Sequence, residues 1–415
     1  MTTIQPSSTR RIHSILPIAL ASVLLLGAAR LVFDDLKNDD IFTWQFWSLR
    51  GSEPRKSSIG DGAAEEDDNV SRPLYTEESC PYLVKQVTCQ RNGRPDDYYQ
   101  FWRWQPNDCN LPRFNASKLL GILRNKRMMF VGDSIQRTQF DSMVCLLQSS
   151  IPDGKKALHK VPSKKIFYAQ EYNATVEFYW APFIVELNSD YSTNHTVLKR
   201  LVKLDSIVDH SKHWEGVDVL VFESYIWWMH KPIINATSSA PSNIREYNVP
   251  TAYKIALQTW AKWLESSINS QKQNVLFVSL SPTHLWSQEW NPGEGNCFGE
   301  SYPIKEPYWG VGTSIDMLNI VRETLGGLKT DVTLLNITHL LDLRKDAHTS
   351  VYIERKGKLL TKEQKADPKT FADYIHWCLP GVPDTWNEIL YAYLIQDGGI
   401  DLSRVSYAEF ICYCT

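Results

Sequence analysis

The sequence predicts an α/β fold in which helices cover both faces of a parallel sheet. Short runs of β-branched and aromatic residues predict buried strands at Met128–Val131, Val217–Phe222, Val275–Leu280 and Val332–Ile337. Apolar residues at helical spacing predict helices between them, at Ile135–Gln148 and Ala252–Ser267. Strands that alternate with helices form parallel sheets with helices on both faces. A chain of 415 residues with 43% hydrophobic residues can form the core of such a fold.

The first element along the chain is a predicted transmembrane helix at residues 14–33. Ile15–Ala29 is almost entirely apolar, and the segment has the ~20 residues that cross a bilayer. Two arginines precede it and two aspartates follow it, which places a tail of residues 1–13 in the cytosol. The alternative is a signal peptide cleaved at Gly27–Ala29. Both readings place the rest of the chain in the lumen or outside the cell.

A stem, a globular domain and a tail are expected after this segment. Residues 34–72 read as a flexible stem, because Gly60–Asp68 is acidic and has few apolar residues. The globular domain is expected at 73–395, and 396–415 is set apart as a C-terminal tail.

Sequons and cysteines agree with a lumenal location. Four of the eight cysteines, at positions 80, 89, 109 and 145, cluster in the first part of the domain and favour structural disulfides. The pairwise spacing of zinc ligands is absent, so no metal site is predicted. The net charge of −3 and the lack of a basic stripe argue against a nucleic-acid partner. The sequon asparagines, which are candidate glycosylation sites, are Asn69, Asn115, Asn173, Asn194, Asn235 and Asn336.

Two distant motifs supply the parts of a Ser–His–Asp triad. Gly132-Asp133-Ser134 follows the first predicted strand, and Asp373 and His376 stand three residues apart near the other end of the domain. A serine nucleophile needs an imidazole to take its proton and a carboxylate to orient that imidazole. Sites in open α/β sheets form at the carboxyl ends of strands, where Ser134 falls. We therefore predict Ser134 as nucleophile, His376 as general base and Asp373 as its partner. A helix N-cap is the other role open to Ser134.

Further candidates flank these motifs. Asp133 and Arg137 are placed in the site as oxyanion or substrate contacts, although Asp133 could instead fix the turn and Arg137 could form a surface salt bridge. Tyr225, Trp227 and Trp228 follow the strand that ends at residue 222, at the same edge of the sheet. They are candidates for stacking on an acceptor sugar, and core packing is the alternative.

Six segments around these motifs share a recognisable pattern. They are Cys89–Asp96, Trp102–Pro106, Cys109–Phe114, Phe130–Ser134, Asp373–Gly381 and Asp384–Glu388. In them the chain resembles the plant trichome birefringence-like family of cell-wall polysaccharide O-acetyltransferases, over residues 73–395. Glu177–Phe183 and Ser281–His284 are most similar to its xylan-acetylating branch. The resemblance implies an SGNH/GDSL-hydrolase-like core with a smaller disulfide-linked lobe, and the disulfides Cys80–Cys145 and Cys89–Cys378.

The resemblance also implies a function and a location. The expected enzyme is a single-pass type II protein of the Golgi membrane with a lumenal catalytic domain. It would pass an acetyl group from a donor through an acetyl-serine to O-2 or O-3 of xylosyl residues of xylan, and it would need no cofactor besides the donor. Two alternatives stay open. One is an acetyl esterase with the same triad, and the other is a catalytically inactive protein that binds wall polysaccharides.

The chain departs from the family pattern in three places. Tyr374 stands where the family usually has cysteine, and an upstream segment that begins with Cys-Asp is missing before residue 73. These two changes remove the expected partners of Cys109 and Cys297. Glu223-Ser224 replaces the usual Asn-Thr or Asn-Ser, which puts a carboxyl group near the site. The tail has no counterpart in the family.

Overall fold

The computed structural model describes the globular domain and one short segment before it. The described residues are 47–51, 72–106, 111–188, 190, 200–237, 244–285, 290, 296–304 and 308–396. The predicted transmembrane helix, most of the predicted stem and residues 397–415 lie outside them, as do Asn69, Asn194 and Cys109. Within the described ranges, no helix combines the length and the apolar content that crossing a bilayer requires.

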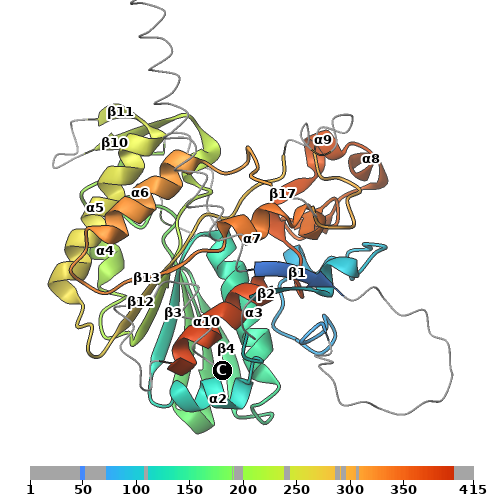
Figure 1. The fold of residues 1–415 in the computed structure, drawn as a ribbon, viewed down its shortest axis with the longest axis horizontal. Coiled ribbons are helices and arrows are strands. Elements are labelled where there is room, and N and C mark those ends of the chain that lie inside the picture. The colour runs from blue at the N-terminus through green and yellow to red at the C-terminus, as the bar shows by residue number, and fades with distance from the viewer. Residues whose placement is uncertain are drawn as a thin grey trace, which may run out of the picture.

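A seven-stranded sheet forms the centre of the fold (Figure 1). In spatial order its strands are β13 (Thr333–Leu335), β12 (Asn274–Val278), β9 (Val219–Phe222), β3 (Arg127–Gly132), β6 (Ala174–Trp180), β5 (Lys164–Ala169) and β4 (Lys156–Val161). The four predicted strands are β3, β9, β12 and β13, and neighbouring strands from β13 to β6 pair in parallel.

The prediction of a purely parallel sheet is wrong at one edge. β4 and β5 pair antiparallel across a two-residue loop, Pro162-Ser163, and β5 pairs antiparallel with β6. A loop of two residues allows only antiparallel neighbours, because a parallel connection needs a crossover of a dozen or more residues. The sheet is therefore mixed.

Helices cover both faces of this sheet, as predicted. On one face Phe140 of α3 packs its ring against Phe130 of β3. Phe130 pairs in register with Val221, so the next residue, Phe222, points to the opposite face. There it contacts Trp260 of α5. The helices are α2 (Ala116–Ile122), α3 (Ser134–Gln148), α4 (Val208–Ser211), α5 (Val249–Ser267), α6 (Ile315–Gly326), α7 (Thr338–Asp342), α8 (Lys362–Lys365), α9 (Pro368–Phe371) and α10 (Val382–Gln396).

Smaller sheets surround the core. A four-stranded sheet has the order β11 (Ile244–Asn248), β10 (Ile233–Thr237), β8 (Val202–Lys203) and β7 (Glu186–Leu187). Three two-stranded pairs are β1 (Trp47–Gly51) with β2 (Trp102–Pro106), β14 (His348–Ser350) with β17 (Asp373–Trp377), and β15 (Glu354–Arg355) with β16 (Lys358–Leu359). β1 lies within the segment that was predicted to be a stem.

A smaller lobe joins the beginning and the end of the domain beside the sheet, where Figure 1 shows blue and red segments together. Both disulfides implied by the resemblance are present. Cys80–Cys145 ties this lobe to α3, and Cys89–Cys378 ties it to the residue that follows β17. Cys297 is buried and unpaired among the described residues, and it interacts electrostatically with Tyr374, which stands where the resemblance implied a cysteine.

Candidate active site

The nucleophile elbow connects β3 to α3. β3 ends at Gly132, Asp133 caps the helix, and Ser134 is its first residue. A Cβ on Gly132 would lie 2.4 Å from the Glu223 carbonyl oxygen and 2.9 Å from Cβ of Gln136, so only glycine lets β9 approach this closely. The Gln136 side chain donates a hydrogen bond to the Val221 carbonyl at 2.8 Å. The elbow is therefore fixed directly against the neighbouring strand.

The structure brings the three predicted triad residues together. Nε2 of His376 lies 2.8 Å from Oγ of Ser134, and Nδ1 of His376 lies 2.9 Å from Oδ2 of Asp373. The Ser134 side chain therefore faces the histidine, while Asp133 takes the capping position that was considered for the serine. This is the arrangement in which an imidazole can take the serine proton and a carboxylate holds the imidazole.

Asp373 is partly buried, with its side chain 10% exposed, and its charge is held by hydrogen bonds. Its Oδ1 accepts from the backbone N–H groups of Ile375 at 3.0 Å and His376 at 2.8 Å. Burial acts to raise the pKa of Asp373, but the charge and hydrogen bonds of His376 outweigh burial and hold the pKa below its usual range. Asp373 is thus ionised and accepts the Nδ1 proton, which leaves Nε2 free to act as the base.

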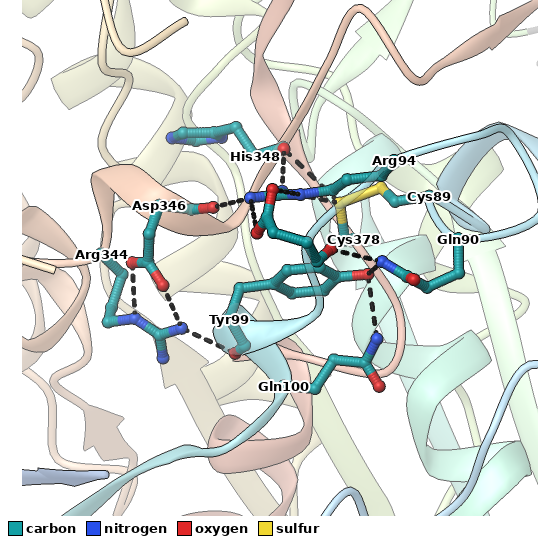
Figure 2. Close-up of polar contacts among 10 residues, drawn as sticks. Cys89, Gln90, Arg94, Tyr99, Gln100, Arg344, Asp346, His348 and Cys378 are labelled. Carbon is teal, nitrogen blue, oxygen red and sulfur yellow. Dashed lines mark hydrogen bonds and ion pairs between the residues drawn. A yellow bond between two sulfur atoms is a disulfide. The ribbon is translucent and has the colours of Figure 1, made fainter. Parts of the chain in front are cut away.

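A cluster of polar contacts supports the strand that carries His376. β17 pairs with β14, and Arg94 donates hydrogen bonds to the backbone carbonyls of His348 at 3.1 Å and Asp346 at 2.7 Å. Figure 2 shows the Arg94 guanidinium between these carbonyls and the Cys89–Cys378 disulfide. Its centre lies 4.2 Å above the Tyr99 ring. The motif Cys89–Asp96 therefore has a structural role, because it holds β17, the strand that carries His376, to the smaller lobe.

The triad opens on a cavity of ≈ 660 Å³. It is lined by Ser134, Arg137, Ile375 and His376, by residues 160–165 of the β4–β5 hairpin, by Phe178 and Trp180 of β6, and by Gln86, Ile226, Trp227 and His230. Arg137 is thus placed where a substrate contact was predicted. Sequence reasoning did not find the hairpin, Gln86 or His230. The hairpin had a signal in the sequence, because a two-residue turn between β-rich runs, here Pro162-Ser163, predicts a hairpin.

Of the three aromatic candidates, only Trp227 faces this cavity. Its ring meets the Trp180 ring at a centroid distance of 5.3 Å. Tyr225 and Trp228 are buried in the core, so their prediction as acceptor contacts is wrong. The Trp228 indole N–H donates to Ser224 Oγ at 2.9 Å, and the Tyr225 hydroxyl accepts from the Ser314 backbone N–H at 3.0 Å. Successive side chains of a tight turn point in different directions, which explains why neighbours have different fates.

Two carboxyl groups lie buried beneath the elbow. Asp133 is fully buried, so it is not the substrate contact that was predicted; its Oδ1 accepts from the Ile135 N–H at 2.8 Å and caps α3. Among the residues that the structure describes, no third group donates a hydrogen bond to Oδ2 of Asp133 or to either carboxyl oxygen of Glu223. Burial, and then the charge of Asp133, raise the pKa of Glu223 well above its usual range. Two buried carboxylates cannot both be ionised at close range, so Glu223 keeps its proton and shares it with Asp133.

The remaining predictions concern glycosylation sites and metal ligands. Asn115, Asn173 and Asn235 are exposed, whereas Asn336 is half-buried at the end of β13. No cluster of metal-ligating side chains occurs in the part of the chain that the structure describes.

The elbow, the triad and the α/β sheet together define a class of acyl-transfer enzymes. Residues 111–393 match the GDSL/SGNH-like acyl-esterase family found in Pmr5 and Cas1p, and residues 61–110 match the PMR5 N-terminal domain. The second match begins within the segment that was predicted to be a stem.

The chain belongs to the trichome birefringence-like family, which confirms the resemblance. It is 60% identical over 401 residues to protein trichome birefringence-like 31 of Arabidopsis thaliana, covering 94% of this chain and 97% of the relative. It is 47% identical to protein trichome birefringence-like 3 of the same plant, over 78% and 76% of the two chains. It is 51% identical to xylan O-acetyltransferase 6 of Oryza sativa subsp. japonica, over 78% of this chain and 60% of the relative.

Proposed function

We propose that this protein is a polysaccharide O-acetyltransferase that acetylates O-2 or O-3 of xylosyl residues in xylan. The observation that carries the proposal is the 2.8 Å contact between His376 and Ser134, which both line a cavity that aromatic side chains also line. Relatives named xylan O-acetyltransferases support the reaction class and the acceptor. Aromatic rings suit a sugar acceptor, since they offer apolar faces to its C–H groups.

The reaction would proceed in two displacements at Ser134. In the first, Nε2 of His376 takes the hydroxyl proton while Oγ attacks the acetyl carbonyl of the donor; the bond to the leaving group breaks, and His376 returns the proton to that group. In the second, His376 takes a proton from the sugar hydroxyl, whose oxygen attacks the acetyl-serine and releases Ser134 as it regains a proton. Backbone N–H groups at the start of α3 would stabilise both oxyanions.

An acetyl esterase is the second candidate, because the same triad lets water release the acetyl group. The match to a family described as acyl-esterases keeps this reaction in view. The inactive alternative has less support, since the triad is fully assembled. We further propose that the enzyme works in the Golgi lumen, anchored by residues 14–33, on the strength of the apolar run and its flanking charges.

The test is to incubate the full-length protein with an acetyl donor, with and without de-acetylated xylo-oligosaccharides, and to follow products by mass. We expect acetylated oligosaccharide, and loss of several orders of magnitude in rate for Ser134→Ala with unchanged thermal unfolding. Free acetate formed equally fast with and without the acceptor would favour the esterase. A variant that keeps more than about a tenth of the rate would remove Ser134 from the mechanism.

A further inference from the structure

The cavity at the triad carries an unusual set of charges. Four cationic side chains line it, those of Arg137, Lys160, Lys164 and Lys165, and no aspartate or glutamate is among its described lining residues. The whole chain has a net charge of −3, so this is a local concentration of positive charge. A cavity lined by charges of one sign attracts ligands of the opposite sign.

Only part of this charge is neutralised within the protein. Lys165 forms an ion pair with Asp141 at 2.7 Å, and Lys164 lies 3.7 Å from Glu177. Arg137 donates instead to a neutral group, the side-chain oxygen of Gln86, at 2.5 Å. In the described part of the chain, no acid forms an ion pair with Arg137 or Lys160.

The cations also lie close enough to repel one another. The pKa of Lys165 is lowered, first by burial, and the charges of Arg137 and Lys160 add to that effect while Asp141 opposes it. Of these three cations, only Lys165 has an acidic partner among the residues that the structure describes, and that partner is Asp141. An anion placed among them would relieve this repulsion and complete the charge balance.

Protection of the sheet edge is the simpler explanation for lysines on this hairpin. β4 is an edge strand, and exposed lysines prevent such strands from pairing with other chains. That explanation does not cover Arg137, which comes from α3 beside the nucleophile. It does not cover Lys165 either, because its side chain is only 13% exposed. Groups from two elements converge on the cavity, which edge protection does not require.

We propose that Arg137, Lys160 and Lys165 form a basic rim that binds an anionic group of a substrate beside Ser134. The proposal rests on the proposed function and adds a substrate class to it. The group is a carboxylate or a phosphate, the two anions that guanidinium and ammonium groups bind most strongly. A carboxylate would come from a uronic-acid branch on the acceptor, and a phosphate would come from the acetyl donor.

Binding to the full-length Ser134→Ala protein tests the rim without turnover. Two matched pairs of ligands separate the sources: a xylo-oligosaccharide with and without a glucuronic-acid branch, and S-acetyl-4′-phosphopantetheine against S-acetyl-pantetheine, which differ only in one phosphate. By calorimetry we expect the charged member of one pair to bind more tightly, with an advantage that falls as salt rises. Adding Lys160→Gln should reduce that advantage roughly 10- to 100-fold, the size of a lost charge-assisted hydrogen bond. Arg137→Gln should act in the same direction.

Lys155→Gln is the matched control, because it removes the same charge from an exposed position next to β4 that does not line the cavity. Equal affinity for the two members of both pairs would contradict the proposed basic rim. An equal loss of the affinity advantage in Lys155→Gln and Lys160→Gln would contradict it as well. Transfer by the wild type to the neutral oligosaccharide is measured separately. If it occurs without any charge preference, only the rim fails; if anion binding depends on Lys160 but no acceptor is acetylated, only the transferase proposal fails.

Discussion

The two sides of Ser134 hold carboxyl groups in opposite states. On the open side, Asp373 accepts hydrogen bonds from two backbone N–H groups and from His376, and its pKa lies below the usual range. On the buried side, Glu223 interacts with the carboxyl group of Asp133, and its pKa lies well above the usual range. The Asp373 side chain is 10% exposed and Glu223 is 1% exposed, and in both places burial acts to raise the pKa of the carboxyl group. The charge of the neighbouring group, cationic His376 or anionic Asp133, together with the hydrogen bonds that Asp373 accepts, therefore decides which of the two carboxyl groups is charged.

The largest effect is expected on the open side. Asp373→Asn keeps the shape of the side chain but removes the charge that orients His376, so we expect kcat to fall by roughly 10³- to 10⁴-fold. Steady-state acetyl transfer measures this. The fold should survive, because the asparagine oxygen can still accept the two backbone N–H groups.

The pH dependence of stability offers a control for Asp373→Asn. A carboxyl group with a lowered pKa in the folded state stabilises the protein above its unfolded pKa of about 4, and that contribution is lost as pH falls. The wild type should therefore lose stability below about pH 4 more steeply than the variant. Identical acid unfolding curves together with full activity would show that Asp373 is an uncharged structural residue.

Two neighbouring tryptophans, Trp227 at the cavity and Trp228 in the core, allow the open and the buried side to be compared through the effects of side-chain truncation. Trp228→Ala empties a fully buried site and should lower the free energy of unfolding by about 3–5 kcal/mol. Trp227→Ala should cost less stability and act mainly on KM for the oligosaccharide, since this ring faces the cavity. Denaturant unfolding and steady-state kinetics on both variants separate the two effects. If Trp228→Ala changed KM without lowering the free energy of unfolding, Trp228 rather than Trp227 would be the ring that contacts the substrate.

The smallest effect is expected on the buried side, from Glu223→Gln. Glu223 keeps its proton in the folded state but loses it in the unfolded state above a pKa of about 4.5, so it stabilises the protein at low pH and this contribution disappears as pH rises. Gln offers Asp133 a permanent donor. From pH 5.5 to 7.5 the wild type should therefore lose stability relative to the variant, by up to about 1.4 kcal/mol per pH unit.

Comparison of the two proteins removes the contributions of other acids. Asp384, whose pKa burial raises to about 6, titrates in the same range but is present in both chains. Parallel plots of unfolding free energy against pH for wild type and Glu223→Gln would show that Glu223 is not the proton carrier.

The sequence was sufficient to predict the centre of the fold and the triad. β3, β9, β12 and β13 are continuous apolar runs, which is how parallel strands covered on both faces appear in a sequence. The triad follows from chemistry, because a serine at the end of a strand and an Asp–His pair have complementary roles.

The walls of the cavity could not be predicted in the same way. The strand β6 contains Glu177, which suggests a polar surface, yet this carboxylate is buried in an ion pair with Arg127 at 2.8 Å. The segment that forms the hairpin β4–β5 contains many lysines, so in the sequence it resembles an exposed loop. Whether Trp227 or Trp228 faces the cavity depends on the direction of each side chain in one turn, which composition does not specify.

The Cys89–Cys378 bond spans 289 residues and thereby sets an order on biosynthesis. Chains are made from the N-terminus, so the elbow and both cysteines of the Cys80–Cys145 bond emerge long before Cys378. Three other cysteines, at positions 109, 145 and 297, are synthesised after Cys89 and before its partner Cys378. His376 arrives only two residues before that partner. The closing crosslink and His376 thus appear together, and a nascent chain cannot assemble the Ser134–His376–Asp373 triad before the domain is nearly complete.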